Sequence, residues 1–307
     1  RAGSNFLRPR AQAAGRHGRI GGRRYNAAMN ANPGDPLTFQ NDVRLEGSTL
    51  VLAFTGWMDG GDVSTGTVSR LVELLGAEPF AEIDAEPFTI YNLPGSMEVA
   101  ALFRPRLTIE DGLVQSMEMP SNVFYVDEDS KLFLLLGKEP HLNWRLFGDA
   151  VFRLAKRCGV SRMLFVGSFG GPVPHTRQPR LYVACSDASL LPEMEQYGMR
   201  RTGYAGPGSF SSYLLSRAAD EGVQMSSLVV EIPGYLQGAN PLSIEAVSRR
   251  LAKILQLSLD LDELRAASTQ WELQISNLVE QNEEFAGKVR ELEQQYDNDL
   301  LDQAGEG

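Results

Sequence analysis

The chain alternates short apolar runs with segments whose apolar residues recur every three or four positions. Residues 49–55 and 162–166 are continuous apolar runs followed by glycines, which is typical of strands buried on both faces of a sheet. Residues 68–75 and 147–158 each carry one apolar stripe at helical spacing. This repeated order of strand, glycine and helix predicts an α/β fold with a mostly parallel central sheet covered by helices on both faces.

Weaker patterns predict the remaining elements. Asp62 is the expected N-cap of the first helix, and Gly76 is its expected end. The segments 123–126 and 131–136 flank a turn-rich stretch and predict a hairpin. Further strands are expected at 88–91, 181–185 and 227–232, and further helices around 189–197, at 209–221 and from 243.

The C-terminal segment has a different period. Its apolar positions are separated by alternating steps of four and three residues, which predicts a helical heptad seam. Asn282 is the one polar position in this seam, which consists of Trp271, Ile275, Leu278, Asn282, Phe285, Val289, Leu292 and Tyr296. An acidic helix of this kind needs a partner for its stripe. That partner is either the α/β body of the same chain or the helices of another subunit, and the sequence leaves both open.

The chain consists of three regions that differ in net charge. The value of −10 for the whole chain is the sum over these regions. Residues 1–34 hold seven arginines and no acidic residue, and their composition predicts a disordered head. Residues 35–257 form the predicted α/β domain. Residues 258–307 hold 13 acidic residues against three basic ones and form the predicted helical tail.

Composition narrows the class of protein. The chain is 43% apolar but has no unbroken run of about 18 apolar residues, so no membrane-spanning helix is predicted. An acidic chain repels phosphate backbones, which argues against nucleic-acid binding. The two cysteines, Cys158 and Cys185, cannot form a disulfide framework and indicate a reducing compartment, the cytoplasm. With three histidines and no phosphate-binding glycine loop, the sequence predicts neither a metal nor a cofactor.

Candidate chemistry gathers in three segments that each follow a predicted strand, at 56–61, 137–145 and 172–177. Since such sheets bind ligands at the carboxyl ends of their strands, five side chains are candidates for acid–base work on an anionic substrate in one cleft: Asp59, Glu139, His141, His175 and Arg177. The alternative is structural. Glu139 would then cap a helix, the histidines would bond to backbone, and Arg177 would pair with an acid. The spacing places no nucleophile beside a base.

Four motifs in these segments and beyond them resemble one known family. FTGWMDGG, LLLGKEPHLNWRLF, GSFGGPVPHTRQPR and YAGPGSF resemble the PAC2 family, the proteasome assembly chaperone 2 family, and most closely its actinobacterial members. The resemblance runs from about residue 40 to about 280. It implies a three-layer α/β/α fold similar to the phosphorylase-like hydrolases, a homo-oligomer and a C-terminal helical extension. The motifs supply the candidate site residues Gly56, Trp57, Asp59, Glu139, His141, Trp144, His175, Arg177, Gly206 and Pro207.

Two functions follow from these observations. The first is a non-catalytic, chaperone-like protein of the PAC2 family that binds partner proteins, with proteasome subunits as candidates. The second is a small-molecule-binding protein or hydrolase that uses the cleft at the strand ends. The missing nucleophile favours the first, and the clustering of His, Glu and Arg after strands favours the second.

Overall fold

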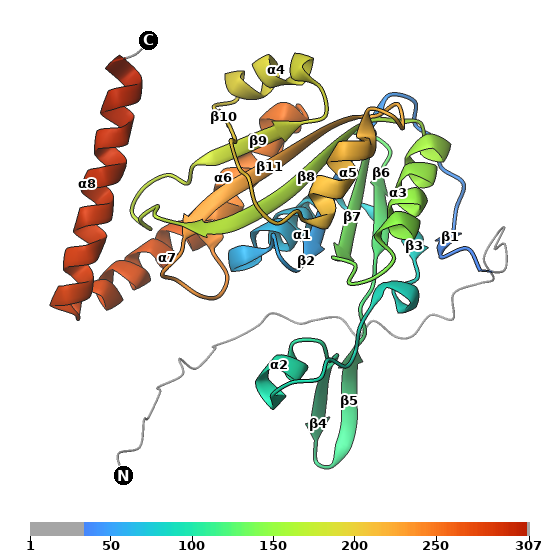
Figure 1. The fold of residues 1–307 in the computed structure, drawn as a ribbon, viewed down its shortest axis with the longest axis horizontal. Coiled ribbons are helices and arrows are strands. Elements are labelled where there is room, and N and C mark those ends of the chain that lie inside the picture. Colours follow the sequence, from blue (N-terminus) through green and yellow to red (C-terminus); the bar gives the residue numbers. More distant parts are fainter. Residues whose placement is uncertain (1–33, 306–307) are drawn as a thin grey trace.

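The computed structural model of the protein describes residues 34–305 and centres on one large sheet (Figure 1). Nine strands of the described chain form this sheet in the order β1-β3-β6-β7-β2-β8-β11-β9-β10. Their bounds are β1 Leu37–Phe39, β2 Ser48–Thr55, β3 Glu78–Ile83, β6 Val123–Asp127, β7 Leu132–Lys138, β8 Val160–Gly171, β9 Leu181–Cys185, β10 Arg200–Arg201 and β11 Gln224–Pro233. The predicted disordered head lies almost entirely outside the described residues.

The centre of the sheet is parallel, as predicted, and its edges are mixed. Strands β7, β2, β8 and β11 run parallel, with Leu52 in register with Leu135 on one side and Phe165 on the other. Strands β6, β3 and β1 continue the sheet antiparallel on one side, and β9 lies antiparallel to β11 on the other. The continuous apolar runs are therefore buried on both faces, because helices cover the parallel strands from above and below.

Helices on both faces complete the predicted three-layer α/β/α fold. Helices α3 and α5 bury aromatic residues on one face, where Phe54, Phe147 and Phe210 lie with ring centroids 5.1–6.0 Å apart. Helices α1 and α6 pack on the other face. The α-helices are α1 Val63–Leu75, α2 Met97–Ala101, α3 Trp144–Cys158, α4 Leu191–Gln196, α5 Phe210–Ala218, α6 Pro241–Ile254, α7 Asp262–Glu280 and α8 Glu283–Gly305.

One local prediction is wrong, and another holds only for the position of the residue. No strand forms at 88–91: Glu86–Phe88 is a turn of 3-10 helix that contains Pro87, and Phe88 packs on Phe147 in the core. Asp62 is the N-cap residue of α1, as predicted, but its backbone is left-handed, with φ of 53°, and its carboxylate makes no capping bond. The cap of α1 is supplied from Asp59, described below.

The largest unpredicted feature is an arm formed by residues 92–120. It contains α2 and a hairpin of β4 (Arg106–Glu110) and β5 (Leu113–Glu118), and it projects away from the sheet (Figure 1). At the tip of the hairpin, Asp111 and Gly112 both adopt positive φ, as a two-residue hairpin turn requires.

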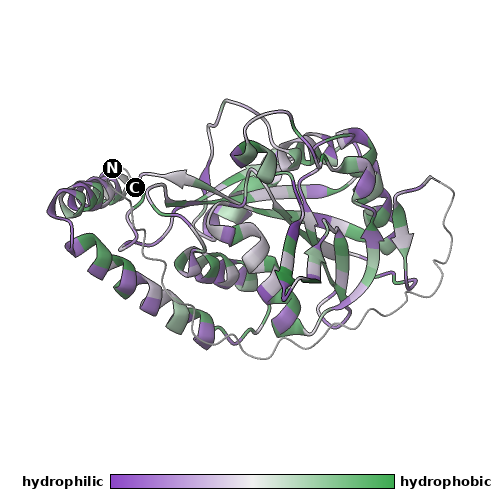
Figure 2. Cartoon of the chain, turned by 90° about the horizontal axis from the view of Figure 1, so that it is seen from below, coloured by the Kyte–Doolittle hydropathy of each residue, from purple (hydrophilic) through white to green (hydrophobic). Residues whose placement is uncertain are grey.

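The C-terminal heptad seam forms two helices rather than one. The chain turns at Asn282, whose Oδ1 accepts a hydrogen bond from the Phe285 backbone N–H at 3.0 Å and so caps α8. Figure 2 shows α7 and α8 extending beside the body with hydrophilic and hydrophobic residues interleaved. Part of the seam packs on the same chain, where Ile275, Phe285 and Val289 lie in one apolar cluster with Tyr235. Asn282 is therefore a helix cap, not a polar position inside a continuous seam.

Candidate functional site

The carboxyl ends of β2 and β7 meet at Gly56, where the first motif begins. Gly56 has φ of 142°, and a Cβ at this position would lie 2.9 Å from both Cβ and Oε2 of Glu139. Only glycine fits this approach without strain. The sequence therefore needs glycine here so that the Glu139 side chain can lie against the end of β2.

Glu139 uses both carboxylate oxygens to hold backbone. Its Oε2 accepts a hydrogen bond from Trp57 N–H at 2.9 Å, and its Oε1 accepts one from Phe210 N–H at 2.8 Å. Phe210 is the first residue of α5, so the carboxylate also lies at a helix N-terminus, where negative charge is stabilised. Glu139 thus connects three chain segments, and each of its oxygens accepts a backbone hydrogen bond.

Asp59 caps α1 from the turn that follows β2. Its Oδ1 accepts from the Thr65 N–H at 3.0 Å and its Oδ2 from the Thr65 hydroxyl at 2.7 Å. Burial raises the pKa of Asp59 to about 6, and the bonds from Thr65 oppose that rise. Both carboxylate oxygens of Asp59 therefore accept hydrogen bonds that stabilise the fold, like those of Glu139.

His141 and Trp144 stabilise the segment that follows β7. Nδ1 of His141 accepts a hydrogen bond from Ile90 N–H at 3.0 Å, and burial lowers the pKa of the imidazole. The Trp144 indole N–H donates to the Pro140 carbonyl at 2.7 Å. The bond to Ile90 lies within the segment 88–91, where a strand was predicted and none forms.

His175 and Arg177 lie on the side of the molecule that faces the C-terminal helices. His175 is 1% exposed; its Nδ1 lies 2.8 Å from Tyr235 Oη and its Nε2 lies 3.1 Å from Ser276 Oγ of α7. Arg177 forms two hydrogen bonds, of 2.9 and 2.8 Å, with the carboxylate of Asp297 in α8. Burial lowers the pKa of His175, and the pairing with Asp297 raises that of Arg177.

The five acid–base candidates therefore have separate structural partners. Within residues 34–305, no hydrogen bond or ion pair joins any two of the side chains Asp59, Glu139, His141, His175 and Arg177. Glu139, His141 and Arg177 make the contacts that the structural alternative describes, with a helix N-terminus, a backbone N–H and an acid. The expectation that His175 bonds to backbone is wrong for its imidazole, which lies between the side chains of Tyr235 and Ser276. Asp59, which the alternative did not include, caps a helix.

Other motif residues meet at an aromatic pocket instead. The pocket has a volume of about 360 Å³ and lies between α5 and the face of β8, β11 and β9. Trp57 and Pro207 line it, together with Phe169, Tyr182 and Tyr204. Trp57 is 64% exposed, Tyr204 67% and Phe169 39%, so three aromatic rings are accessible at one site. Of the described residues that line the pocket, none carries a formal charge.

The loop 202–209 closes one side of this pocket through contacts of its own. The Tyr204 hydroxyl donates to the Pro207 carbonyl at 3.0 Å, and the phenol ring lies against Gly206 so closely that a Cβ there would collide with it. Glycine at 206 therefore lets the loop hold Tyr204 at the pocket.

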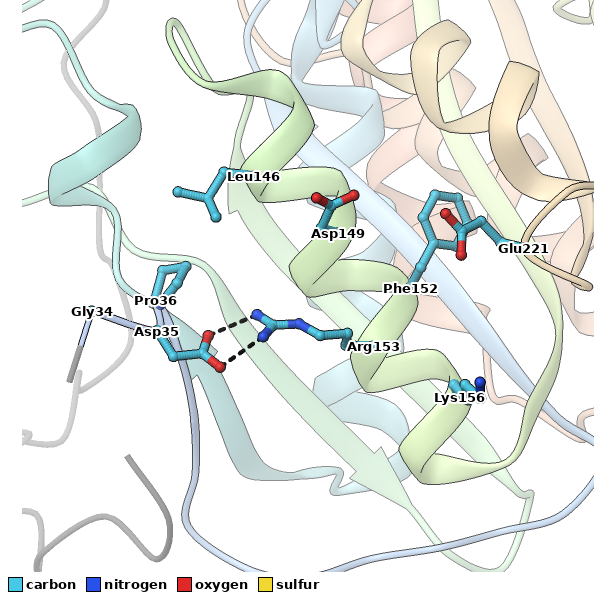
Figure 3. A pocket seen from close by; sticks show the side chains of 9 residues that line it. All are labelled: Gly34, Asp35, Pro36, Leu146, Asp149, Phe152, Arg153, Lys156 and Glu221. Atoms are coloured by element: carbon cyan, nitrogen blue, oxygen red, sulfur yellow. Dashed lines mark hydrogen bonds and ion pairs between the residues drawn. The ribbon is translucent and has the colours of Figure 1, made fainter. Parts of the chain in front are cut away.

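A separate hollow lies between the start of β1 and α3, and three acidic side chains on its wall outnumber the two basic ones, Arg153 and Lys156. Figure 3 shows Asp35 paired with Arg153 through two hydrogen bonds, of 2.7 and 2.8 Å. Asp149, also on its wall, pairs with Arg217 at 2.8 Å. With these groups paired, the hollow offers no free guanidinium to an anionic ligand.

The comparisons with known proteins agree with this geometry. A family model described as the PAC2 family matches residues 53–279, which is most of the chain. The chain belongs to the PAC2 family. The matched region contains the Trp57 turn, Glu139, the His175 loop and the loop that carries Gly206 and Pro207.

Solved structures share the PAC2 fold along nearly their whole length. A Mycobacterium tuberculosis protein of unknown function is 25% identical, with a TM-score of 0.79 over 92% of this chain and 95% of that one. A Streptomyces avermitilis PAC2 family protein is 27% identical (TM-score 0.66; 79% and 99% covered). A Mycobacterium tuberculosis proteasome-assembly chaperone homologue is 26% identical (TM-score 0.67; 78% and 99% covered). No curated protein matches the chain.

The hydroxyl and thiol groups that could act as nucleophiles in this PAC2 protein are hydrogen-bonded to other hydroxyls or buried. In the aromatic pocket, Ser209 Oγ bonds to the hydroxyls of Ser211 and Ser212 rather than to a base. Cys158 is buried, which raises the pKa of its thiol to about 12. Within residues 34–305, no three His, Cys, Asp or Glu side chains gather to hold a metal ion, and no helix has the length and apolar character needed to cross a bilayer.

Sequence reasoning missed the aromatic residues that complete the PAC2 pocket. Phe169 lies between the glycines of GSFGG, Tyr204 begins YAGPGSF, and Tyr182 lies in β9. An aromatic residue flanked by glycines has few neighbouring side chains to cover it, and that signal could have identified the first two. The contribution of Tyr182 depends on β9 pairing with β11, which only the folded sheet reveals.

Proposed function

We propose that this PAC2 protein is a non-catalytic, chaperone-like protein that binds other protein chains through the aromatic pocket at Trp57. The observation that carries the proposal is the meeting of three exposed aromatic rings, Trp57, Phe169 and Tyr204, around a pocket without charged lining. We propose further that it acts in the cytoplasm, where the free thiols Cys158 and Cys185 stay reduced.

The pocket has the composition of a protein-binding site. Aromatic residues are enriched at protein interfaces, and the largest share of binding energy comes from anchors that fill desolvated pockets. A volume of about 360 Å³ with apolar and hydroxyl-bearing walls fits a large apolar side chain. The partner we propose therefore presents a Phe, Leu or Met side chain on an exposed segment.

The state of the acid–base groups supports binding rather than catalysis. Both oxygens of Glu139 hold backbone N–H groups, and the imidazole of His175 lies between Tyr235 and Ser276. Proton transfer at either ring nitrogen of His175 would break a bond that fixes a chain segment, and the carboxylate of Glu139 is used to hold two backbone N–H groups.

Proteasome subunits are the partners that we propose. One relative at 26% identity is described as a proteasome-assembly chaperone homologue, and it shares the fold over 99% of its length. The test mixes the purified chain with the recombinant proteasome α subunits of its source organism and measures mass by size exclusion with light scattering. A complex of defined stoichiometry is expected. Separate elution of the two at concentrations of tens of micromolar overturns the choice of partner.

A second candidate function is the binding of a small uncharged ligand in the same pocket. The hydroxyls of Ser211 and Ser227 on its wall favour this reading, because they offer hydrogen bonds to a ring-bearing ligand such as a nucleoside. Adenosine is the probe. A rise in the thermal midpoint that is lost in Trp57→Ala supports the ligand, and a flat response up to millimolar adenosine counts against it.

A further inference from the structure

A third hollow lies at the carboxyl ends of two central strands, against the base of the arm at residues 92–120. Its volume is about 640 Å³, and we call it the strand-end hollow. Thr55 ends β2 and Lys138 ends β7, and both residues line the hollow. Residues 104–106 and 118–120 of the arm form a second part of its wall, and the first two turns of α1 form a third. Three separate parts of the chain therefore border it.

The strand-end hollow lies at the switch point of the sheet. Strand β2 is followed by α1, which packs on one face, whereas the neighbouring parallel strand β7 is followed by α3, which packs on the opposite face. Chain segments that leave adjacent parallel strands toward opposite faces open a crevice between the strand ends, and open α/β sheets bind their ligands in such crevices. The topology alone thus indicates a ligand site between Thr55 and Lys138.

The charged groups of this hollow are largely unpaired. Three basic and two acidic side chains line it, and these are Arg104, Arg106, Lys138, Asp62 and Glu118. Among the described residues, the charged groups of Lys138 and Arg106 have no ion-pair or hydrogen-bond partner. Arg104 donates to the neutral side chain of Asn92 at 3.2 Å and pairs with no acid of the described chain. Unlike the guanidinium of Arg153 in the hollow beside β1, these cations are free to bind an anion.

Lys138 is the cation that most directly indicates an anionic ligand. Its side chain is half-buried, and burial lowers the pKa of its ammonium group without an opposing contribution from an acid. Holding a charged amine partly out of water costs free energy unless a negative charge compensates it. A bound anion would supply that compensation.

The set of donors matches a phosphate group. Arginine binds phosphate oxygens through its planar fork of N–H groups, and lysine binds them as a compact charge. Three cations suit a phosphate monoester, which carries a charge of about −1.5 to −2 at pH 7. The hydroxyls of Thr55, Ser69 and Ser121 on the same wall offer further hydrogen bonds.

The size and the acids of the hollow indicate what the phosphate is attached to. A volume of about 640 Å³ is of the size that holds a whole small organic ligand. The carboxylates of Asp62 and Glu118 would repel a second phosphate, but they accept hydrogen bonds from hydroxyl groups. A sugar carries such hydroxyls beside its phosphate.

We propose that the strand-end hollow binds a sugar phosphate. Lys138, Arg104 and Arg106 hold the phosphate, and the sugar hydroxyls face Asp62 and Glu118. The described residues that line this hollow differ from those of the aromatic pocket, so the site is separate from the proposed protein-binding site.

Ribose 5-phosphate is the probe, and its affinity for the full chain is measured by isothermal titration at low ionic strength, where charges are least screened. Saturable binding with a Kd of about 1 mM or lower is expected. R106Q and K138M are each expected to weaken binding about tenfold or more, because each removes one charge-assisted contact. K138R keeps the charge and is expected to stay within about threefold of the wild type.

Matched controls separate the site from the overall charge of the chain. R145Q in α3 and K253M in α6 each remove one exposed cation outside the hollow and are expected to leave the affinity unchanged. Ribose, which lacks the phosphate, is expected not to bind. R106Q remains informative if K138M fails to fold, because Arg106 is exposed on the arm.

Three results would overturn the proposal. The first is the absence of saturable binding of ribose 5-phosphate up to about 10 mM. The second is equal affinity in the wild type and R106Q. The third is tighter binding of the dicarboxylate malate than of ribose 5-phosphate, which would assign the hollow to carboxylates instead of phosphates.

Discussion

The imidazole of His175 and the phenol of Tyr235 are joined twice. Tyr235 Oη accepts a hydrogen bond from the His175 backbone N–H at 2.9 Å and lies 2.8 Å from His175 Nδ1. Since Oη already accepts one hydrogen bond, we assign its own proton to the bond with Nδ1. Nε2–H then donates to Ser276 Oγ at 3.1 Å, which connects the loop after β8 to α7. A histidine that looked like a catalytic candidate thus attaches the C-terminal helices to the body.

Tyr235→Phe is expected to destabilise the protein by about 1–3 kcal/mol, because it leaves the buried His175 N–H and Nδ1 without a partner. Urea unfolding followed by circular dichroism measures the change. Tyr91→Phe is the control: the Tyr91 hydroxyl bonds to Glu86 at the surface, and its loss is expected to change the free energy of unfolding by less than about 0.5 kcal/mol. Equal effects in the two variants would contradict the role of Tyr235.

Glu139→Ala is expected to lower the free energy of unfolding by about 2–3 kcal/mol, since two N–H groups lose a charged acceptor. Glu128→Ala, which removes an exposed carboxylate in the turn between β6 and β7, is the matched control and is expected to be neutral within about 0.5 kcal/mol. A carboxylate kept for catalysis would show the opposite result, with stability unchanged or raised on its removal.

Asp59 makes a distinct contribution to the pH dependence of stability. Its pKa in the folded chain, about 6, lies above the ordinary value of 3.8, so the folded state binds more protons between these two values. The free energy of unfolding therefore falls as pH rises from about 4 to about 6 through this group, by about 1–2 kcal/mol. Asp59→Asn removes that contribution, so the difference between variant and wild type, measured by urea unfolding, should shift in favour of the variant over this range. A constant difference would show that Asp59 titrates normally.

Tyr296 anchors α8 to the body. It is buried, its hydroxyl donates to the Gln178 carbonyl at 2.9 Å, and the Arg180 guanidinium lies 4.4 Å from its ring centroid. Tyr296→Ala is expected to speed hydrogen exchange in residues 283–302 by about tenfold or more while α6 stays protected. Leu300→Ala removes a more exposed side chain of the same helix and should have little effect. Unchanged exchange in Tyr296→Ala would mean that α8 is held by other contacts.

The central fold follows from the sequence because its signals are local. The apolar run at 49–55 and the stripe at 147–158 each specify an element that parallel topology then buries. The arm was missed because its apolar residues are exposed and therefore do not follow a burial pattern. Its one clear signal, Asp111-Gly112 between alternating apolar residues, is a typical hairpin turn.

The candidate site was harder to predict because side-chain partners come from distant segments. The sequence identified Glu139 and His175, but not that Phe210, 71 residues later, takes one oxygen of Glu139, or that Ser276, 101 residues later, lies beside His175. The seam at 271–296 was found by its period, whereas its break at Asn282 depends on a cap that a heptad pattern disguises. The type of a residue indicates which chemistry its side chain could perform. Tertiary contacts decide whether that side chain is free to perform it.

The most direct test of the proposed function is the affinity of the chain for a proteasome α subunit, measured by isothermal titration for wild type, Trp57→Ala and Leu278→Ala. Trp57 and Leu278 are 64% and 61% exposed, but only Trp57 lines the aromatic pocket. We expect Trp57→Ala to weaken binding by about thirtyfold, or about 2 kcal/mol, and Leu278→Ala to leave it unchanged. Equal affinities for wild type and Trp57→Ala would contradict the claim that this protein binds its partner through the pocket.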